Sequence, residues 1–195
     1  FSKYKLLAIV LTGLSVVIIS VIYSVLKPLE VLPVYQPSLV SAALVAQDIR
    51  HQKKYHTITD FSLTNQEGQT ITQDTYKGKM YVADFFFATC QSICPKMSSQ
   101  LVHVQNAFKN DKDVLLLSHT VNPSNDNVEV LNGYAQTYGA IKNKWHLLTG
   151  NKKAIYDMAR YSYLVNALQE DGSAEGFLHS ELFILIDKQK RIRGF

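Results

Sequence analysis

The sequence predicts an α/β domain, a sheet with helices on both faces, behind an apolar N-terminal segment. Strand-like and helix-like runs alternate from His56 onward, which is typical of α/β folds. Residues 6–26 contain no charged side chain. The only two cysteines, Cys90 and Cys94, stand where a strand-like run gives way to a helix-like one. These features predict one domain that presents two thiols at the start of a helix.

Length and composition agree with this organisation. The 195 residues allow one domain of ordinary size plus an appendage. A hydrophobic content of 47% and a charged content of 18% fit a globular domain with an apolar extra segment. The net charge of +4 is mild, and the lysines form no basic stripe with interleaved aromatic residues. Composition therefore gives no support to nucleic-acid binding.

Residues 6–26 are predicted to form an uncleaved transmembrane anchor. About 21 residues, at a rise of about 1.5 Å each, cross a hydrocarbon core of ~30 Å. Tyr4 and Tyr23 lie near the ends, where amphipathic rings favour the interface. Lys3 and Lys5 precede the span, which favours a cytoplasmic N-terminus. The alternatives are a core helix and a cleaved signal peptide, whose apolar region is normally only about 7–15 residues.

The chain is predicted to have three parts. Residues 1–27 form the N-terminus and anchor, residues 28–54 a linker, and residues 55–195 the α/β domain. Three prolines within residues 28–37 predict an extended linker. A short helical segment is expected within residues 38–52.

The domain begins with a predicted hairpin that leads into the central strand. Residues 55–63 read as a strand, residues 65–68 (NQEG) as a turn, and a second short strand starts at Ile71. Residues 80–87 are rich in aromatic and branched side chains, so they predict the central strand.

Helices and strands then alternate. Residues 94–109 predict a helix, because apolar residues recur there at spacings of three and four. Residues 113–121 (DVLLLSHTV) predict a buried strand, and residues 125–138 a helix that ends at Gly139 as a C-terminal cap. The remaining predicted elements are a strand at 145–148, a helix at 152–163, a polar loop at 170–176, a strand at 182–187, and a last strand after a turn at 189–191.

The cysteines are the strongest chemical signal. If Cys94 lies in the first helical turn and Cys90 in the loop before it, their sulfur atoms can converge. Pro95 suits the first helical position, where a missing N–H costs no helical bond. The partial positive charge of a helix N-terminus favours thiolate. A reactive pair is therefore predicted, with a structural disulfide or two inert buried thiols as alternatives.

Two thiolates invite a soft metal, Cu(I) or zinc, which usually takes a third ligand. His179 is one of six histidines, and it ends a polar loop and begins a strand from which it could reach the thiols. A lone histidine is more often structural, so the pattern leaves this ligand open. Asp84 within the apolar central strand is either a buried acid beneath the thiols or an outward-facing carboxylate. Met97 is expected to be a core residue rather than a ligand.

Four segments resemble the Sco/SenC family of membrane-anchored, thioredoxin-like copper proteins. FFFATCQSICPKM contains the family's CxxxCP motif behind an aromatic strand. LLSHTVNPSND is similar to its S-V-D-P-x-x-D turn, KWHLLTG to its W-x-x-L-T-G, and FLHSELFILID to its H-S-x-x-x-x-L-I-D. The resemblance covers roughly residues 55–195. One departure is Asn122, where the family usually has Asp, whereas Asp126 keeps the second acid of that turn.

The resemblance implies a copper metallochaperone with a thioredoxin fold that helps to build the dinuclear copper centre of cytochrome c oxidase. Carried over by position, the copper ligands are Cys90, Cys94 and His179, for Cu(I) and also Cu(II). The implied partners are the copper-binding subunit of cytochrome c oxidase or another copper chaperone. No transit peptide precedes the anchor, so a bacterial inner membrane with the domain in the periplasm is expected. Family members continue with a further helix, so the encoded chain is expected to extend beyond Phe195.

Two other functions stay open. A thiol–disulfide oxidoreductase would use Cys90 and Cys94 as a redox pair, although enzymes of this fold more often have CxxC and do not need His179. A redox sensor or peroxide-reducing thiol protein is the other, but the TxxC form of peroxidatic sites is absent, since Thr89 directly precedes Cys90.

Overall fold

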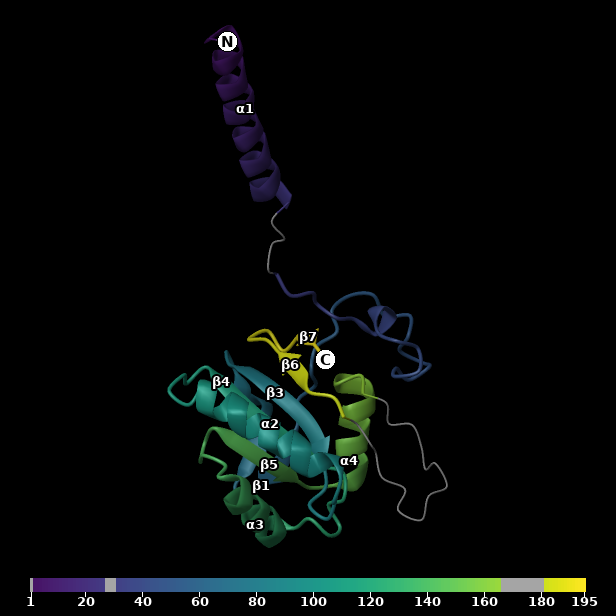
Figure 1. The fold of residues 1–195 in the computed structure, drawn as a ribbon. Coiled ribbons are helices and arrows are strands. Elements are labelled where there is room, and N and C mark those ends of the chain that lie inside the picture. Colours follow the sequence, from purple (N-terminus) through teal and green to yellow (C-terminus); the bar gives the residue numbers. More distant parts are fainter. Residues whose placement is uncertain (1, 27–30, 166–180) are drawn as a thin grey trace. The chain divides into compact units, whose positions relative to one another are not determined.

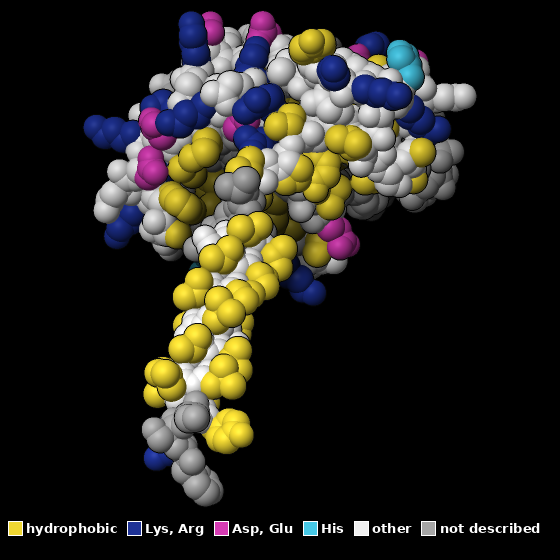
Figure 2. All heavy atoms as spheres, turned by 90° about the horizontal axis from the view of Figure 1, so that it is seen from above, with side chains coloured by type: hydrophobic (Ala, Val, Ile, Leu, Met, Phe, Trp, Pro, Cys, Tyr) yellow, Lys and Arg dark blue, Asp and Glu magenta, His cyan; other side chains and the backbone are white. Residues whose placement is uncertain are grey.

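The computed structural model describes residues 2–26, 31–165 and 181–195. The chain divides into two compact units, Phe1–Leu32 and Pro33–Phe195. The first contains the helix α1, Ser2–Leu26. Hydrophobic side chains cover it on the side seen in Figure 2. Its segment Tyr4–Leu26 is long and apolar enough to cross a membrane, a test of length and composition that a signal sequence would also pass.

The second unit is built on a mixed sheet of seven strands in the order β2-β1-β5-β4-β3-β6-β7 among the described residues (Figure 1). β3 pairs in parallel with β4, and β4 with β5, whereas every other pairing is antiparallel. The strands are β1 Ser62–Asn65, β2 Thr70–Thr72, β3 Met80–Phe86, β4 Val114–Thr120, β5 Trp145–Thr149, β6 Ile184–Ile186 and β7 Ile192–Gly194. The predicted central strand therefore lies between β4 and β6.

Helices cover both faces of the sheet, as predicted. Successive side chains of β3 point to opposite faces. Phe86 packs its ring against Tyr134, which belongs to the helix α3 (Val128–Tyr138), and the helix α2 (Ile93–Ala107) covers the same face. Phe85 points the other way and meets Tyr163, which follows the helix α4 (Lys152–Asp157) and the π-helical turn η3 (Met158–Ser162).

Local sequence explains where several elements begin and end. All seven residues of β4 are buried, the apolar run Val114–Leu117 and the three polar residues that follow it. The side chain of Asn127 caps α3 by accepting a hydrogen bond from the backbone of Val130, and Gly139 ends the helix with a φ of 62°. Gly68, with a φ of 76°, closes the predicted hairpin turn. Two further 3-10 turns occur, η1 at Pro37–Leu39 and η2 at Gln73–Tyr76.

Three predicted elements differ from the structure. The first strand begins at Ser62 rather than Tyr55, because the preceding residues are bonded elsewhere: Ile58 donates its N–H to the carbonyl of Lys190. The segment 38–52 contains turns rather than a helix beyond η1. The helix predicted at 152–163 ends in the π-helical turn η3. The predicted loop at 170–176 lies outside the described residues.

Part of the predicted linker packs against the last strand. The backbone N–H of Tyr35 donates to the carbonyl of Ile192 over 2.9 Å, and its ring meets that of Phe195 edge-on at 5.2 Å. The Nε of Arg193 donates to the carbonyl of Pro33 over 2.9 Å. This segment therefore covers an otherwise open edge of the sheet, which protects strand donors and acceptors from intermolecular pairing.

Candidate functional site

Both cysteines lie at the junction between β3 and α2. Cys90 is in the loop that follows β3, and Cys94 is the second residue of α2. Pro95 comes next, still within the first turn, where N–H groups have no helical acceptor. The side chains are buried, with exposed fractions of 9% and 3%, and both thiols are free. Cys90 therefore lies in the loop and Cys94 in the first helical turn, the two positions that the sequence predicted for them.

The start of the helix points a hydrogen-bond donor at the first sulfur. The backbone N–H of Cys94 donates to the Sγ of Cys90 over 3.4 Å. The hydroxyl of Ser92 lies 3.9 Å from the same sulfur. The N–H of Cys90 is bonded to the carbonyl of Phe87 over 3.2 Å, which closes a tight turn before the thiol. Donors converge on Cys90 in the arrangement that stabilises a thiolate.

These contacts and burial give the two thiols different pKa values. Burial alone raises the pKa of Cys90, but hydrogen bonds from the thiol and backbone of Cys94 and from Ser92 outweigh it and lower the pKa to about 7. The pKa of Cys94 is raised to about 12, chiefly by burial and then by its bond to Cys90, with a contribution from the charge of Asp84. Near neutral pH, Cys90 is therefore the nucleophile and Cys94 keeps its proton.

Asp84 is buried on the face of the sheet that carries the cysteines. Of the two alternatives left by the sequence, the buried acid is therefore correct and the outward-facing carboxylate is not. The Oγ of Ser118 donates to its Oδ1, and the indole N–H of Trp145 donates to that Oγ over 2.9 Å. The Oδ2 has no partner among the described residues. Burial raises the pKa of Asp84 to about 7, against the lowering effect of Ser118. Sequence reasoning did not single out Ser118, because nothing local distinguishes the residue that follows the apolar run Val114–Leu117.

The turn after β4 also approaches the cysteine loop. The N–H of Val121 donates to the carbonyl of Phe86 over 2.8 Å. Asn122 follows, partly buried, at the position where an acid was expected. Asp126 is completely buried, and its carboxylate accepts the N–H of Ala88 over 3.0 Å.

His179 lies outside the described residues. β6 runs antiparallel to β3 and pairs Ile184 with Ala83. It therefore begins toward the end of the sheet at which the cysteine loop follows β3. Among the residues that the structure does describe, no group of three or more His, Cys, Asp or Glu side chains could hold a metal ion. Met97 is buried in the core side of α2, as predicted.

Three other histidines have structural surroundings. His119 is fully buried, stacks on Phe85, and has its pKa lowered to about 3 by burial. The Nδ1 of His146 lies 2.6 Å from the hydroxyl of Tyr76. His56 binds the carbonyl of Ser162 over 2.8 Å. These rings lie on the face of the sheet opposite the thiols or beside the sheet, away from the cysteine pair.

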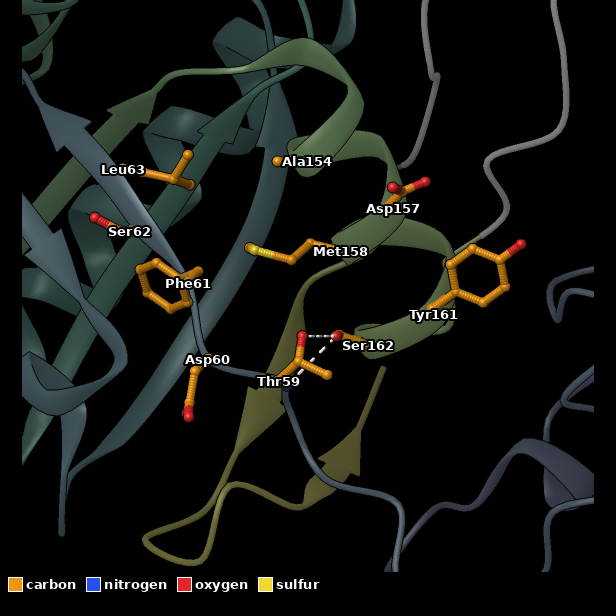
Figure 3. A pocket seen from close by; sticks show the side chains of 10 residues that line it. All are labelled: Thr59, Asp60, Phe61, Ser62, Leu63, Ala154, Asp157, Met158, Tyr161 and Ser162. Carbon is orange, nitrogen blue, oxygen red and sulfur yellow. Dashed lines mark hydrogen bonds between the residues drawn. The ribbon is translucent and has the colours of Figure 1, made fainter.

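A pocket of about 420 Å³ lies between the segment leading into β1 and the helices α4 and η3 (Figure 3). Phe61 and Met158 point toward its interior, and the hydroxyls of Thr59 and Ser162 share a hydrogen bond at one side. Asp60 and Asp157 are its acidic residues, and each pairs with a lysine. Neither cysteine lines it, so this pocket is separate from the candidate site.

Comparison with known proteins identifies relatives across the whole domain. A sequence profile of the family described as SCO1/SenC matches residues 49–195. The crystal structure of a SCO1/SenC family lipoprotein from Bacillus anthracis is 32% identical and superposes with a TM-score of 0.61, covering 70% of this chain and 82% of that one.

Two further solved structures carry functional descriptions. BsSco, described by its disulfide switch and as a member of the Sco family of cytochrome c oxidase assembly proteins, is 26% identical with a TM-score of 0.59 over 70% of this chain and 80% of its own. Arabidopsis thaliana ScoI with copper bound is 27% identical with a TM-score of 0.55 over 69% and 83%. These likenesses confirm the thioredoxin-like fold implied by the sequence motifs.

Proposed function

Because the chain belongs to the SCO1/SenC family, we propose that it is a copper chaperone in the assembly of cytochrome c oxidase. Its cargo is one copper ion, bound by Cys90, Cys94 and His179 and passed by ligand exchange to an acceptor. The acceptor is the copper-binding subunit of the oxidase or another copper chaperone.

The observation that carries the proposal is the convergence of two free thiols at one helix N-terminus. The 3.4 Å contact from the Cys94 N–H to the Cys90 sulfur brings the two residues into one site. A pair of thiolates suits Cu(I), which prefers soft ligands and low coordination numbers. The pKa of Cys90, lowered to about 7, means that about half of this thiol is ionised at neutral pH, so a proton competes with the metal less than at an ordinary cysteine.

His179 is proposed as the third ligand on two grounds. Its sequence context, HSELFILID, resembles the family's histidine motif. The antiparallel pairing of β6 with β3 brings the chain that leads into β6 to the end of the sheet where the cysteine loop begins. An imidazole completes a set of two sulfur atoms and one nitrogen, which can serve Cu(I) and, with added ligands, Cu(II).

The helix α1 is proposed to anchor the domain to a bacterial inner membrane by a single span, with the domain in the periplasm. Its length and composition support the span. Lys3 and Lys5 on the N-terminal side support a cytoplasmic N-terminus. Two free cysteines in an oxidising compartment would be subject to disulfide formation, which removes both thiolates and releases Cu(I).

A second candidate function, thiol–disulfide exchange, is favoured by the separation of the two thiol pKa values. A nucleophilic Cys90 near pKa 7 beside a protonated Cys94 is the arrangement of an attacking thiol and a resolving thiol. In such a reaction the Cys90 thiolate attacks a partner disulfide and one partner sulfur leaves as a thiolate. Cys94 then gives its proton to the partner thiolate, displaces the second partner sulfur as a thiolate and forms the Cys90–Cys94 disulfide, so the partner gains two electrons.

Titration of Cu(I) against a competing chelator separates these functions. The reduced full-length protein in detergent micelles should bind one Cu(I), and the oxidised protein little. His179→Ala should weaken Cu(I) binding while leaving disulfide formation intact, and Cys90→Ser or Cys94→Ser should abolish both. His103→Ala, a histidine on the exposed side of α2, is the matched control and should bind like wild type. If His179→Ala binds Cu(I) as tightly as wild type, the three-ligand site is wrong and thiol exchange becomes the better function.

A further inference from the structure

The carboxylate of Asp126 joins two loops that are distant in the sequence. Its Oδ2 accepts the backbone N–H of Ala88 over 3.0 Å and also the hydroxyl of Thr120. Ala88 stands two residues before Cys90, whereas Asp126 lies in the turn between β4 and α3. The contact therefore spans the ends of two adjacent parallel strands, β3 and β4.

The carboxylate is itself held rigidly. Asp126 has an exposed fraction of 0%, and its N–H donates to the carbonyl of Asn122 over 2.9 Å. Its second oxygen, Oδ1, accepts the side-chain amide of Asn125 over 3.2 Å. Thr120 reinforces the turn, because its hydroxyl also accepts the N–H of Asn122 over 3.0 Å. A buried side chain with this many fixed partners can position a neighbour to within a fraction of an ångström.

The neighbour that it positions is the start of the cysteine loop. Beyond Phe86 the ladder between β3 and β4 ends with the bond from Val121 to the Phe86 carbonyl. The next described anchor of the loop on this side is the bond from Ala88 to Asp126, and the turn from Phe87 to Cys90 follows at once. The position of the Cys90 side chain thus depends on a hydrogen-bond acceptor, Asp126, that lies 36 residues further along the chain.

We infer that Asp126 is a positioning residue for the thiol pair: as a hydrogen-bond acceptor for Ala88 it holds Cys90 where the first turn of α2 can donate to its sulfur. Loss of the acceptor frees the loop and leaves the N–H of Ala88, a half-buried residue, unpaired. The Cys90 sulfur then loses its alignment with the Cys94 N–H. For copper this inference rests on the proposed function, whereas for thiol reactivity it stands by itself.

The test compares three variants of the full-length protein in detergent micelles. Asp126→Ala removes the acceptor. Asp126→Asn keeps a carbonyl oxygen of the same reach and is the conservative rescue. Asn125→Ala is the matched control, because it removes only the donor to Oδ1 and leaves the bond to Ala88 intact. The measurements are the rate of Cys90 alkylation by iodoacetamide across pH, the affinity for Cu(I) against a chelator, and the unfolding temperature.

In Asp126→Ala, alkylation of Cys90 at neutral pH should slow by up to about tenfold, because the Cys90 sulfur loses its alignment with the N–H of Cys94. Cu(I) affinity should fall by roughly 10–100-fold, the usual effect of losing a residue that supports a metal ligand. Asp126→Asn and Asn125→Ala should stay close to wild type in both measurements. A purely structural role predicts instead a lower unfolding temperature in Asp126→Ala with an unchanged alkylation profile, and that result would overturn the inference.

Two further outcomes have defined meanings. If wild type binds no Cu(I) while Asp126→Ala still slows alkylation, the proposed function fails and the positioning role stands. If Asp126→Ala does not fold, hydrogen exchange in the wild-type protein decides. The amide of Ala88 should then exchange far more slowly than those of the exposed Thr89 and Gln91. Equal exchange rates would refute the hydrogen bond from Ala88 to Asp126.

Discussion

The backbone N–H of Cys94 points at the sulfur of Cys90 across 3.4 Å, so the two cysteines are linked before any disulfide or metal joins them. The bond exists because Cys94 occupies the first turn of α2, where its N–H has no helical acceptor. The helix dipole adds to its effect on a negative sulfur. Together with the thiol of Cys94 and with Ser92, this contact lowers the pKa of Cys90, whereas burial raises the pKa of Cys94, so Cys90 ionises first.

The first prediction concerns the pH dependence of thiol reactivity. With its pKa lowered to about 7, Cys90 should be alkylated at half its maximal rate near pH 7, whereas Cys94, with its pKa raised to about 12, should stay unreactive up to mildly alkaline pH. Mass spectrometry after a brief iodoacetamide pulse at each pH distinguishes the sites. Equal labelling of the two cysteines at pH 7 would contradict this assignment.

The second prediction concerns Asp84. Its pKa is about 7 in the folded protein and near 3.8 when unfolded, so the folded state binds the extra proton between these values. Stability should therefore fall as pH rises from about 4 to 7, by at most on the order of 4 kcal/mol. Asp84→Asn should lack this decline. The measurement is the free energy of unfolding from urea titrations at a series of pH values.

Comparison of slopes isolates this effect from other groups. His119, whose pKa is lowered to about 3, acts in the opposite direction and removes stability as pH falls below about 6.5. It is present in both proteins, so its contribution cancels in the difference between wild type and Asp84→Asn. Parallel curves for the two proteins between pH 4 and 7 would show that Asp84 is ionised in the fold.

The third prediction concerns Lys144, whose ammonium group donates to the carbonyls of Phe108, Asp111 and Val114. It closes the connection between α2 and β4. Lys144→Met leaves these carbonyls without their donor and should destabilise the domain by roughly 3 kcal/mol. Lys142→Met is the control, because that lysine is exposed and pairs with Glu67 at the surface among the described residues. It should cost less than about 1 kcal/mol, and similar losses for both variants in chemical unfolding would refute the prediction.

The fourth prediction concerns the N-terminal segment. The full-length chain should sediment with membranes and be released by detergent, because α1 carries an uncharged span of sufficient length. A chain that starts at Pro33 should be soluble and folded, since the second compact unit begins there. Recovery of the uncleaved chain in the soluble fraction without detergent would contradict the anchor.

A shorter chain tests the role of the segment before the domain. Starting at Ser38 removes the bond from the N–H of Tyr35 to Ile192, the bond from the N–H of His56 to the side chain of Gln36, and the ring contact with Phe195. This chain should unfold with roughly 1–3 kcal/mol less free energy than the one that starts at Pro33. Equal stability would show that the segment only rests on β7.

Much of the fold could be predicted because it is encoded locally. The apolar run of β4, the Gly139 cap of α3 and the alternation of strands and helices are properties of short segments. The same holds for the thiol pair, since a spacing of four across a strand-to-helix junction brings both cysteines to one turn. The first strand was predicted too early because residues 56–61 belong to no strand, and their partners, Lys190 for Ile58 and Ser162 for His56, are distant in the sequence.

The sequence by itself therefore determined the class of fold, the apolar helix and the position of the reactive thiols, because each depends on neighbours along the chain. Only the tertiary structure decided that Asp84 is buried on the cysteine side and that His119 faces away from it, since the side of a strand is set by what packs on it. It also decided that Asp126 meets Ala88. Such contacts join segments distant in the chain, and no local pattern of residues carries the geometry that brings them together.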